Sequence, residues 1–236
     1  MMNRITKVED IGSSPNSTKP PVVCSTGIEV NRIYNESCFD TMAKMPDKFV
    51  DLIVTDPPYG VELEYDTYND TEENWKEMFC KLIPEMKRVS QMAIMPSCRI
   101  KMLPFIYQTH PPDWLICWYK GSPGHSAYIG FNDWEPLLVY GKKQGLQMHD
   151  YFQTTNIEKM GNYGHPCPKP LKWSKWLIAK ASDEGQLIYD PFMGSGTTAI
   201  AAHQMKRNWI GSEISENYCR AIEKRLAPYL AQTSLF

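Results

Sequence analysis

Short apolar runs alternate with longer amphipathic segments along this chain from about residue 31 onward. The apolar runs predict strands, and segments with apolar residues every three to four positions predict helices. The predicted strands cover residues 31–35, 50–55, 91–95, 115–119, 137–140, 187–189 and 209–211, and the predicted helices cover residues 75–89, 100–108, 171–181, 197–205 and 216–226. Such alternation predicts an α/β fold with a mostly parallel, doubly wound sheet, in which sites lie at the carboxyl ends of strands.

Two stretches of the chain depart from this alternation. Residues 1–27 carry a polar stretch rich in Gly, Ser and Pro, which predicts a flexible tail. Residues 28–236 are then predicted to form one domain. Within that domain, residues 141–164 contain four glycines and show little periodicity, so this stretch is predicted to be an irregular insert with a function of its own.

Composition narrows the class of protein. The chain is 42% hydrophobic and 22% charged, and it has no apolar run near the ~18 residues that a membrane span requires. None of its seven cysteines forms a C-x-x-C motif, and no histidine completes a zinc spacing, so we expect reduced thiols, no metal and a cytoplasmic location, in a bacterium or in the host cell of a phage.

Charge is unevenly distributed although the formal net charge is only −2. Residues 56–77 contain eight acids and one lysine, and residues 141–180 contain seven lysines and two acids. A basic stretch of this kind is explained about equally well by a solvated face and by a surface that follows phosphates. Charge alone therefore does not predict a nucleic-acid partner.

A proline-rich turn follows the predicted strand at residues 50–55. It reads Asp56-Pro57-Pro58-Tyr59-Gly60. Proline cannot extend a strand ladder and restricts the residue before it, so the chain leaves the sheet in a fixed, extended shape. The turn presents a carboxylate, free backbone carbonyls and an aromatic ring. These groups suit a planar heterocycle that carries an exocyclic amine.

A glycine-rich turn follows the predicted strand at residues 187–189. It reads Asp190-Pro191-Phe192-Met193-Gly194-Ser195-Gly196-Thr197-Thr198, and Glu213 ends the next predicted strand. A strand followed by a glycine turn and a helix favours a nucleotide ligand. An acid at the end of the next strand can accept hydrogen bonds from the ribose hydroxyls of such a ligand. A dinucleotide, S-adenosylmethionine and a tight turn without ligand remain open. An acid at position 190 suits a ligand with an ammonium and a sulfonium better than a pyrophosphate.

Together, the two turns resemble those of the amino-group DNA methyltransferases, which make N6-methyladenine or N4-methylcytosine. The base-holding turn precedes the cofactor turn, as in the circularly permuted β-type members of that family. His165-Pro166-Cys167-Pro168-Lys169-Pro170-Leu171 is similar to the family's His-Pro-x-x-Lys-Pro-Leu segment. The resemblance covers roughly residues 31–228 and implies a Rossmann-like, S-adenosyl-L-methionine-dependent methyltransferase fold.

The resemblance also implies a reaction and its residues. Asp56 and the Pro57 carbonyl would hold the target amine, Pro58 would complete the turn, and Tyr59 would stack on a base flipped out of double-stranded DNA. Cofactor contacts are implied at Ser37, Cys38, Asp56, His165, Lys169, Asp190, Phe192, Gly194, Ser195, Gly196, Thr197 and Glu213. The stretch at 141–164 would recognise the target sequence, alone or with a second subunit in a homodimer, and its Lys142, Lys143 and Lys159 would meet phosphates.

One position departs from the family. Where members usually have Asn-Gly-Asp-Cys, this chain has Asn35-Glu36-Ser37-Cys38. The acid expected beside the cofactor adenine is therefore a serine, and Glu36 or Asp40 is the alternative acceptor.

The favoured interpretation is a DNA adenine-N6 methyltransferase, because the base-holding turn begins with Asp rather than Ser. Cytosine-N4 methylation is the alternative, and methylation of RNA or of a protein amide is less favoured, because those enzymes usually begin the turn with Asn. A binding-only protein would not require both complete turns, and an NAD-dependent enzyme would not explain the turn at Asp56.

Overall fold

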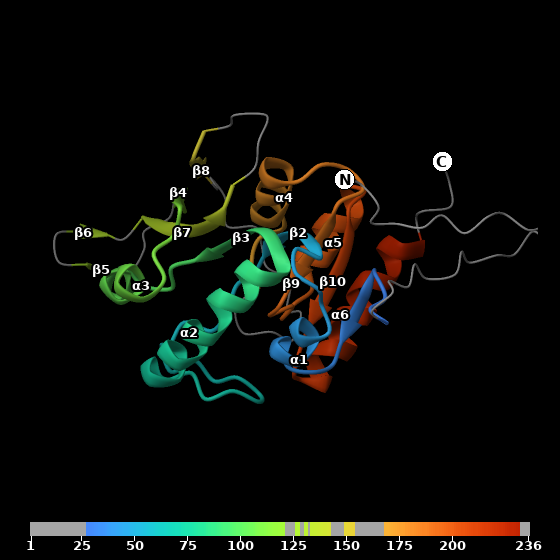
Figure 1. Cartoon of the computed structure of the whole chain (residues 1–236), viewed down its shortest axis with the longest axis horizontal. Coiled ribbons are helices and arrows are strands. Elements are labelled where there is room, and N and C mark those ends of the chain that lie inside the picture. The colour runs from blue at the N-terminus through green and yellow to red at the C-terminus, as the bar shows by residue number, and fades with distance from the viewer. Residues whose placement is uncertain are drawn as a thin grey trace, which may run out of the picture.

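The computed structural model describes residues 27–120, 126–127, 130–131, 133–142, 149–153 and 168–231. Its main sheet has eight strands in the order β1-β10-β9-β2-β3-β7-β4-β8 (Figure 1). The strands of this sheet are β1 (Arg32–Tyr34), β2 (Val50–Val54), β3 (Ser90–Pro96), β4 (Trp114–Tyr119), β7 (Trp134–Gly141), β8 (Tyr151–Gln153), β9 (Leu187–Asp190) and β10 (Asn208–Ser212). A separate two-stranded sheet pairs β5 (Ser126–Ala127) with β6 (Gly130–Phe131).

The sheet is mostly parallel, as the alternation of elements predicts. Strand β7 is the exception among the described strands, because it runs antiparallel to both β3 and β4. Strand β9, from the last third of the chain, pairs directly with β2 from the first third. This strand order places the turn that begins at Asp56 and the turn that begins at Asp190 at the carboxyl ends of neighbouring strands.

Helices cover both faces of the sheet (Figure 1). The helices are α1 (Cys38–Ala43), α2 (Glu72–Val89), the 3₁₀ turn η1 (Ile100–Met102), α3 (Leu103–Thr109), α4 (Leu171–Ala181), α5 (Thr197–Gln204) and α6 (Glu216–Ala231). Side chains of α1, α2 and α3 share one core cluster, and those of α4, α5 and α6 share the other.

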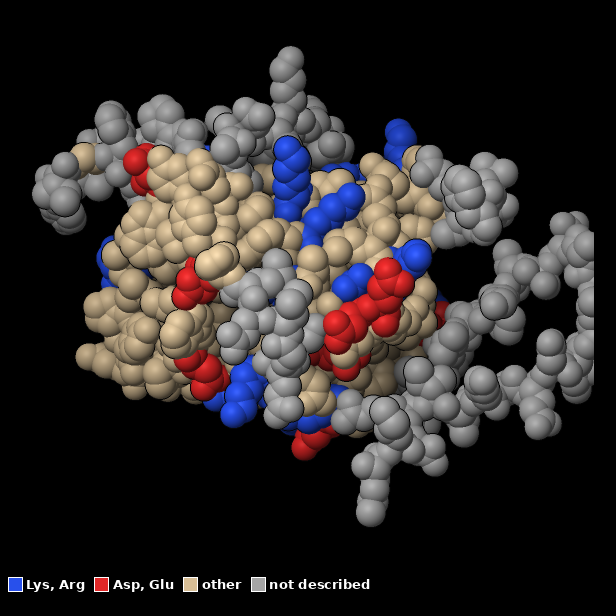
Figure 2. Space-filling model, turned by 90° about the horizontal axis from the view of Figure 1, so that it is seen from above, with Lys and Arg blue, Asp and Glu red and all other residues tan. Residues whose placement is uncertain are grey.

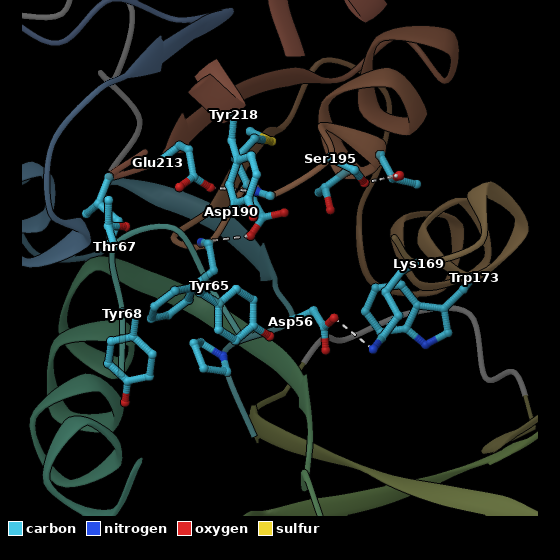
Figure 3. A pocket seen from close by; sticks show the side chains of 17 residues that line it. Asp56, Tyr65, Thr67, Tyr68, Lys169, Trp173, Asp190, Ser195, Glu213 and Tyr218 are labelled. Atoms are coloured by element: carbon cyan, nitrogen blue, oxygen red, sulfur yellow. Dashed lines mark hydrogen bonds and ion pairs between the residues drawn. The ribbon is translucent and has the colours of Figure 1, made fainter. Parts of the chain in front are cut away.

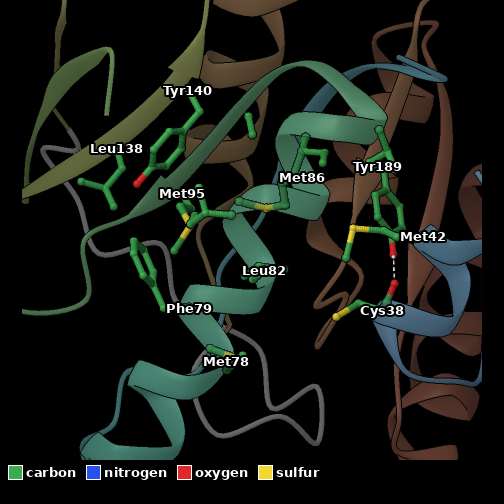
Figure 4. Packing of buried hydrophobic residues seen from close by; sticks show 14 of the residues in the cluster. Cys38, Met42, Met78, Phe79, Leu82, Met86, Met95, Leu138, Tyr140 and Tyr189 are labelled. Carbon is green, nitrogen blue, oxygen red and sulfur yellow. Dashed lines mark hydrogen bonds between the residues drawn. The ribbon is translucent and has the colours of Figure 1, made fainter. Parts of the chain in front are cut away.

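Neighbouring residues of the central strands pack into opposite clusters. In β2, Ile53 packs into the α1–α2–α3 cluster, whereas Leu52 and Val54 pack into the other. In β9, Tyr189 and Ile188 divide in the same way, and Figure 4 shows Tyr189 beside Met42. A strand buried on both faces reads as a continuous apolar run, which is why residues 50–55 were recognisable in the sequence.

The predicted elements are confirmed with small shifts at their ends. Helix α4 has the predicted bounds, α2 begins at Glu72 rather than at residue 75, and α6 continues to Ala231. Helix α1 and strands β5, β6 and β8 were not predicted. The residues of the predicted tail lie outside the described part, apart from Gly27, and the predicted insert at 141–164 is described only at 141–142 and 149–153. None of the described helices is both long and apolar enough to span a membrane.

Candidate active site

The two turns meet at the carboxyl ends of β2 and β9. Thr55, the residue after β2, donates a hydrogen bond of 2.7 Å from its hydroxyl to Oδ1 of Asp190, at the end of β9. The next residue, Asp56, lines the same hollow as Asp190 (Figure 3). Parallel neighbouring strands end at the same sheet edge, and this register brings the two predicted carboxylates together.

A hollow lies between these turns and is walled by side chains from four parts of the chain. Its lining residues are Asp56, Pro58, Tyr65, Thr67, Tyr68, Lys169, Trp173, Asp190, Phe192, Met193, Gly194, Ser195, Thr197, Thr198, Glu213, Ile214 and Tyr218. Eight of the residues assigned to the cofactor from the sequence are among them, and so is Pro58. Pro57 is buried and, like Tyr59, is not part of this lining.

Asp56 is paired on one side only. Its Oδ2 lies 2.7 Å from the ammonium nitrogen of Lys169, and the two side chains are 20% and 12% exposed. Its Oδ1 is buried and has no hydrogen-bond partner among the described residues. Burial raises the pKa of Asp56, and the charge of Lys169 opposes that shift. The carboxylate therefore keeps one oxygen available as an acceptor.

Tyr59 shares the same lysine. Its hydroxyl accepts a hydrogen bond of 3.0 Å from Lys169, whose ammonium nitrogen also lies 4.8 Å from the centre of the tyrosine ring. Burial, followed by the charges of Asp56 and Glu135, raises the pKa of Tyr59 well above its ordinary value. The side chain is thus a neutral phenol at neutral pH.

The glycine turn is held in a conformation that other residues rarely adopt. Gly194 and Gly196 have φ angles of 53° and 77°, and a Cβ on Gly196 would lie 2.6 Å from Cγ2 of Ile222 on α6. The Gly194 amide donates to Oε2 of Glu213 at 2.9 Å. From α6, Arg225 donates to the Ser195 carbonyl at 2.6 Å and to the Thr197 hydroxyl at 2.9 Å.

Asp190 and Glu213 face this hollow as buried carboxylates. They are 3% and 9% exposed. Burial raises the pKa of Asp190 to about 6, although Thr198, Thr55 and the Phe192 amide stabilise its charge. Burial also raises the pKa of Glu213, against backbone hydrogen bonds from residues that include Ser215 and Gly194. Buried carboxylates of this kind favour a cationic or hydroxyl-bearing ligand.

A second hollow adjoins the first, because both are lined by Phe192 and Glu213. It is lined by Ser37, Cys38, Phe39, Tyr68, Asn74, Glu77, Met78, Lys81, Pro191, Phe192, Ser212, Glu213 and Ile214. Ser37 and Cys38 therefore line a hollow that shares four residues with the first, namely Tyr68, Phe192, Glu213 and Ile214. The Ser37 hydroxyl accepts from the Phe39 amide at 3.2 Å and so caps α1.

The alternative acids near Ser37 are placed differently. Glu36 is bound to the ammonium of Lys44 at 2.6 Å and to the Thr41 hydroxyl at 2.9 Å. Asp40 is exposed on α1. Neither side chain lines either hollow.

The acidic stretch after Tyr59 folds into a hairpin at residues 61–70, which we call the 61–70 hairpin. Glu64 and Asn69 form its bridge, and buried Asp70 accepts from the amides of Gly60, Val61 and Leu63. Its tip reaches α6, because Asp66 accepts from the Ser215 hydroxyl and, at 3.2 Å, from the Asn217 amide group.

Three residues of this hairpin line the first hollow: Tyr65, Thr67 and Tyr68. Sequence reasoning missed them, together with Trp173 and Tyr218. The only signal was the length of the polar segment after the base-holding turn. Glu72, another acid of this stretch, forms ion pairs with Lys76, Arg99 and Lys101.

Basic side chains of the described residues do not form one uninterrupted surface on the face seen in Figure 2. Figure 2 shows Lys and Arg lying between groups of Asp and Glu on the face seen from above. Lys142 is exposed directly after β7, whereas Lys143, Lys159 and His165 lie outside the described residues. In the described ranges, no group of three or more His, Cys, Asp or Glu side chains is placed to hold a metal ion.

Comparison with known proteins gives one family. Residues 114–224 match the family model described as DNA methylase, of the N6/N4 methyltransferases. The DNA adenine methyltransferase YhdJ of Escherichia coli (strain K12) is 29% identical over 259 aligned positions, which cover 85% of this chain and 86% of YhdJ.

Solved structures share the fold. The M1.HpyAVI–SAM complex has a TM-score of 0.57 at 22% identity, and the alignment covers 83% of this chain and 98% of that one. The PvuII DNA methyltransferase, specific for cytosine N4, has a TM-score of 0.63 at 16% identity, with 85% and 91% covered.

Proposed function

We propose that this chain is an N6/N4 amino-group DNA methyltransferase that methylates N6 of adenine in a short DNA motif, using S-adenosyl-L-methionine. The unpartnered Oδ1 of Asp56 is the observation that carries this proposal. A buried acceptor without a partner costs free energy, and an exocyclic N–H of a flipped base would satisfy it. The Pro57 carbonyl would accept the second N–H.

Two acceptors on one amine activate it. The lone pair of an exocyclic amine is delocalised into the ring, and hydrogen bonds from both N–H groups favour a pyramidal nitrogen whose lone pair points away from the acceptors. When bound, the cofactor supplies the electrophilic methyl group. Because the reaction is a direct displacement, positioning by the two turns provides most of the rate.

The charged groups that line the two hollows suit this cofactor. Asp190 would pair with the ammonium group, and Glu213 would accept from the ribose hydroxyls. The second hollow, which shares Phe192 and Glu213 with the first, would take the adenine beside Ser37 and Cys38. Lys142, Lys143 and Lys159 would contact DNA phosphates, which gives affinity that depends on salt rather than sequence choice.

Adenine is favoured over cytosine for two reasons. The base-holding turn begins with Asp56, and YhdJ, a DNA adenine methyltransferase, resembles this chain over most of both lengths. The test is methyl transfer from labelled S-adenosyl-L-methionine to unmethylated genomic DNA, with single-molecule sequencing to locate the modified bases. Asp56→Ala is compared with Asp47→Ala, whose side chain is 79% exposed and remote from both hollows.

We expect N6-methyladenine in one short motif, lost in Asp56→Ala and kept in Asp47→Ala. N4-methylcytosine would overturn the choice of base and keep the mechanism. Cofactor binding without modification of any DNA would overturn the DNA substrate.

A further inference from the structure

The indole N–H of Trp173 is a buried donor that the fold leaves without a partner. Trp173 lies in the first turn of α4 and is 1% exposed. Its Nε1 has no hydrogen-bond partner among the described residues, although the side chain lines the first hollow. A buried donor without an acceptor costs free energy, which a ligand that brings an acceptor would recover. The proposed function assigns no role to this residue.

Trp173 lies at the end of the hollow that holds Asp56. Figure 3 shows Asp56, Lys169 and Trp173 together, on the side away from Glu213. The ring centre of Trp118 lies 5.9 Å from the ammonium nitrogen of Lys169 and 5.8 Å from the centre of the Trp173 ring. Lys169 in turn binds Oδ2 of Asp56 at 2.7 Å. The indole donor and the unpartnered Oδ1 of Asp56 therefore belong to one end of the hollow.

The place of Trp173, rather than its unpaired N–H alone, distinguishes it. Trp209 on β10 is 2% exposed, and its Nε1 also has no partner among the described residues. Both tryptophans pack in the cluster of α4, α5 and α6, but Trp209 lines neither hollow. Only at Trp173, of these two, can a ligand in the first hollow bring the missing acceptor.

A donor beside an acceptor matches one edge of a nucleobase. Asp56 requires an N–H from the ligand, and Trp173 requires an atom that accepts. On its Watson–Crick edge, adenine carries the N6 amine next to the unprotonated N1, and cytosine carries the N4 amine next to N3. Guanine and thymine present the reverse, a carbonyl oxygen next to an N–H. Enzymes that flip a base commonly bind this edge by hydrogen bonds.

The carboxylate of the cofactor is the other acceptor to consider. It shares one carbon atom with the ammonium group, so in the proposed function both lie near Asp190. The Ser195 hydroxyl, in the turn that follows Asp190, lines the same hollow and can donate to that carboxylate. Trp173 belongs to another element, beside Asp56, and this place favours the base.

We propose that the indole N–H of Trp173 donates a hydrogen bond to N1 of the flipped adenine while Asp56 accepts one from its N6 amine. Trp173 is then a substrate-binding residue, and two hydrogen bonds from separate elements fix the rotation of the base, so that its amine meets the methyl group. This role rests on the proposed function.

The experiment measures single-turnover methyl transfer to duplexes with adenine, 1-deazaadenine or 7-deazaadenine at the target position of the motif found by sequencing. 1-Deazaadenine replaces N1 by C–H and keeps the amine, whereas 7-deazaadenine keeps N1. Because 1-deazaadenine also alters the reactivity of the amine, the two proteins are compared with each other. It should slow the wild type about tenfold more than it slows Trp173→Phe, and 7-deazaadenine should slow both equally.

Two further variants separate the hydrogen bond from packing. Trp209→Phe makes the same change at a buried tryptophan outside the hollows and should respond to both analogues as the wild type does. Replacement of Trp173 by 3-benzothienylalanine keeps the shape and removes the N–H, so it should respond as Trp173→Phe does. Neither change at Trp173 should alter the dissociation constant of S-adenosyl-L-methionine.

Equal slowing of the wild type and Trp173→Phe by 1-deazaadenine would overturn the contact with N1, and so would a difference seen with 7-deazaadenine in its place. Weaker cofactor binding by both Trp173 variants would assign the N–H to the cofactor and also overturn the proposal. Absence of methyl transfer by the wild type to any DNA would instead overturn the proposed function, and this role with it. If sequencing finds N4-methylcytosine, only the choice of base fails, and the same comparison uses 3-deazacytosine.

Discussion

The ammonium nitrogen of Lys169 lies 2.7 Å from Oδ2 of Asp56, whereas Oδ1 of the same carboxylate has no partner among the residues described. A single buried cation thus stabilises the charge of the carboxylate and occupies only half of its acceptors. Lys169 belongs to the segment just before α4, so this segment supplies the counter-ion for the turn at the end of β2.

Lys169→Met is expected to lower the free energy of unfolding by about 3–5 kcal/mol at neutral pH, because it leaves Asp56 as an uncompensated buried charge. Without the lysine, the pKa of Asp56 in the folded state rises further above its unfolded value, so the loss should shrink as the pH falls and the carboxyl becomes protonated. Urea unfolding at several pH values measures this dependence.

The double variant Asp56→Asn, Lys169→Met is the control for that prediction. It removes both charges, so it should recover most of the lost stability and none of the methyl transfer. If the single and double variants were equally stable, the ion pair would not be the reason for the loss.

Cofactor binding should weaken below about pH 6, since burial raises the pKa of Asp190 to about 6. Above that value Asp190 is ionised and can pair with an ammonium group. Below it the carboxyl is protonated, so affinity should fall by up to about tenfold per pH unit, and binding near pH 6 should release protons. Calorimetry in buffers of different ionisation enthalpy measures both effects.

Asp190→Asn tests whether the pH dependence of cofactor binding comes from Asp190. Burial also raises the pKa values of Asp56 and Glu213, so these two carboxyls are the alternatives. The variant should bind weakly at all pH values and lose most of the pH dependence. A variant that kept the full dependence would assign it to one of the other two carboxyls.

Periodicity was enough to predict elements whose buried residues follow a regular pattern. Strand β2 and helix α4 were recognisable because their apolar residues follow the geometry of one strand and one helix. The place of both turns at the carboxyl ends of strands was also predicted, whereas the pairing of β2 with β9 was not. The antiparallel direction of β7 was not predicted, because pairing direction depends on partners rather than on local pattern.

Contacts between distant segments could not be predicted. Lys169 was expected among the cofactor contacts, and its contacts with Asp56 and Tyr59 arise only when the segment before α4 packs against the turn at the end of β2. The 61–70 hairpin is a similar case. Its acids look like a repulsive patch in the sequence, but Asp70 satisfies backbone amides and Asp66 binds the start of α6.

Gly196→Ala should destabilise the protein by roughly 2–5 kcal/mol. A left-handed conformation costs a non-glycine residue about 1–2 kcal/mol, and the new Cβ would also lie 2.6 Å from Cγ2 of Ile222. Gly185→Ala is the matched control, because Gly185 has a φ of 82° and nothing within 4 Å of an added Cβ.

Thermal unfolding of both variants separates strain from overlap. The extra destabilisation by Gly196→Ala over Gly185→Ala should equal the cost of the contact with Ile222. In an Ile222→Ala background, Gly196→Ala should therefore destabilise the protein less than it does in the wild type. Equal destabilisation by Gly196→Ala and Gly185→Ala would show that the close approach of α6 does not matter.

Asp66→Asn is expected to release bound S-adenosyl-L-methionine faster, by roughly tenfold. Asp66 ties the tip of the 61–70 hairpin to Ser215 and Asn217, and Tyr65 and Tyr68 of that hairpin wall the hollow. Hydrogen bonds to a charged group contribute about 1.5–3 kcal/mol, less at an exposed position, so the neutral amide should hold the hairpin more weakly. Stopped-flow displacement of the cofactor measures the rate. Glu64→Gln, an exposed acid of the same hairpin, should leave it unchanged, and equal rates in both variants would mean that the hairpin does not retain the cofactor.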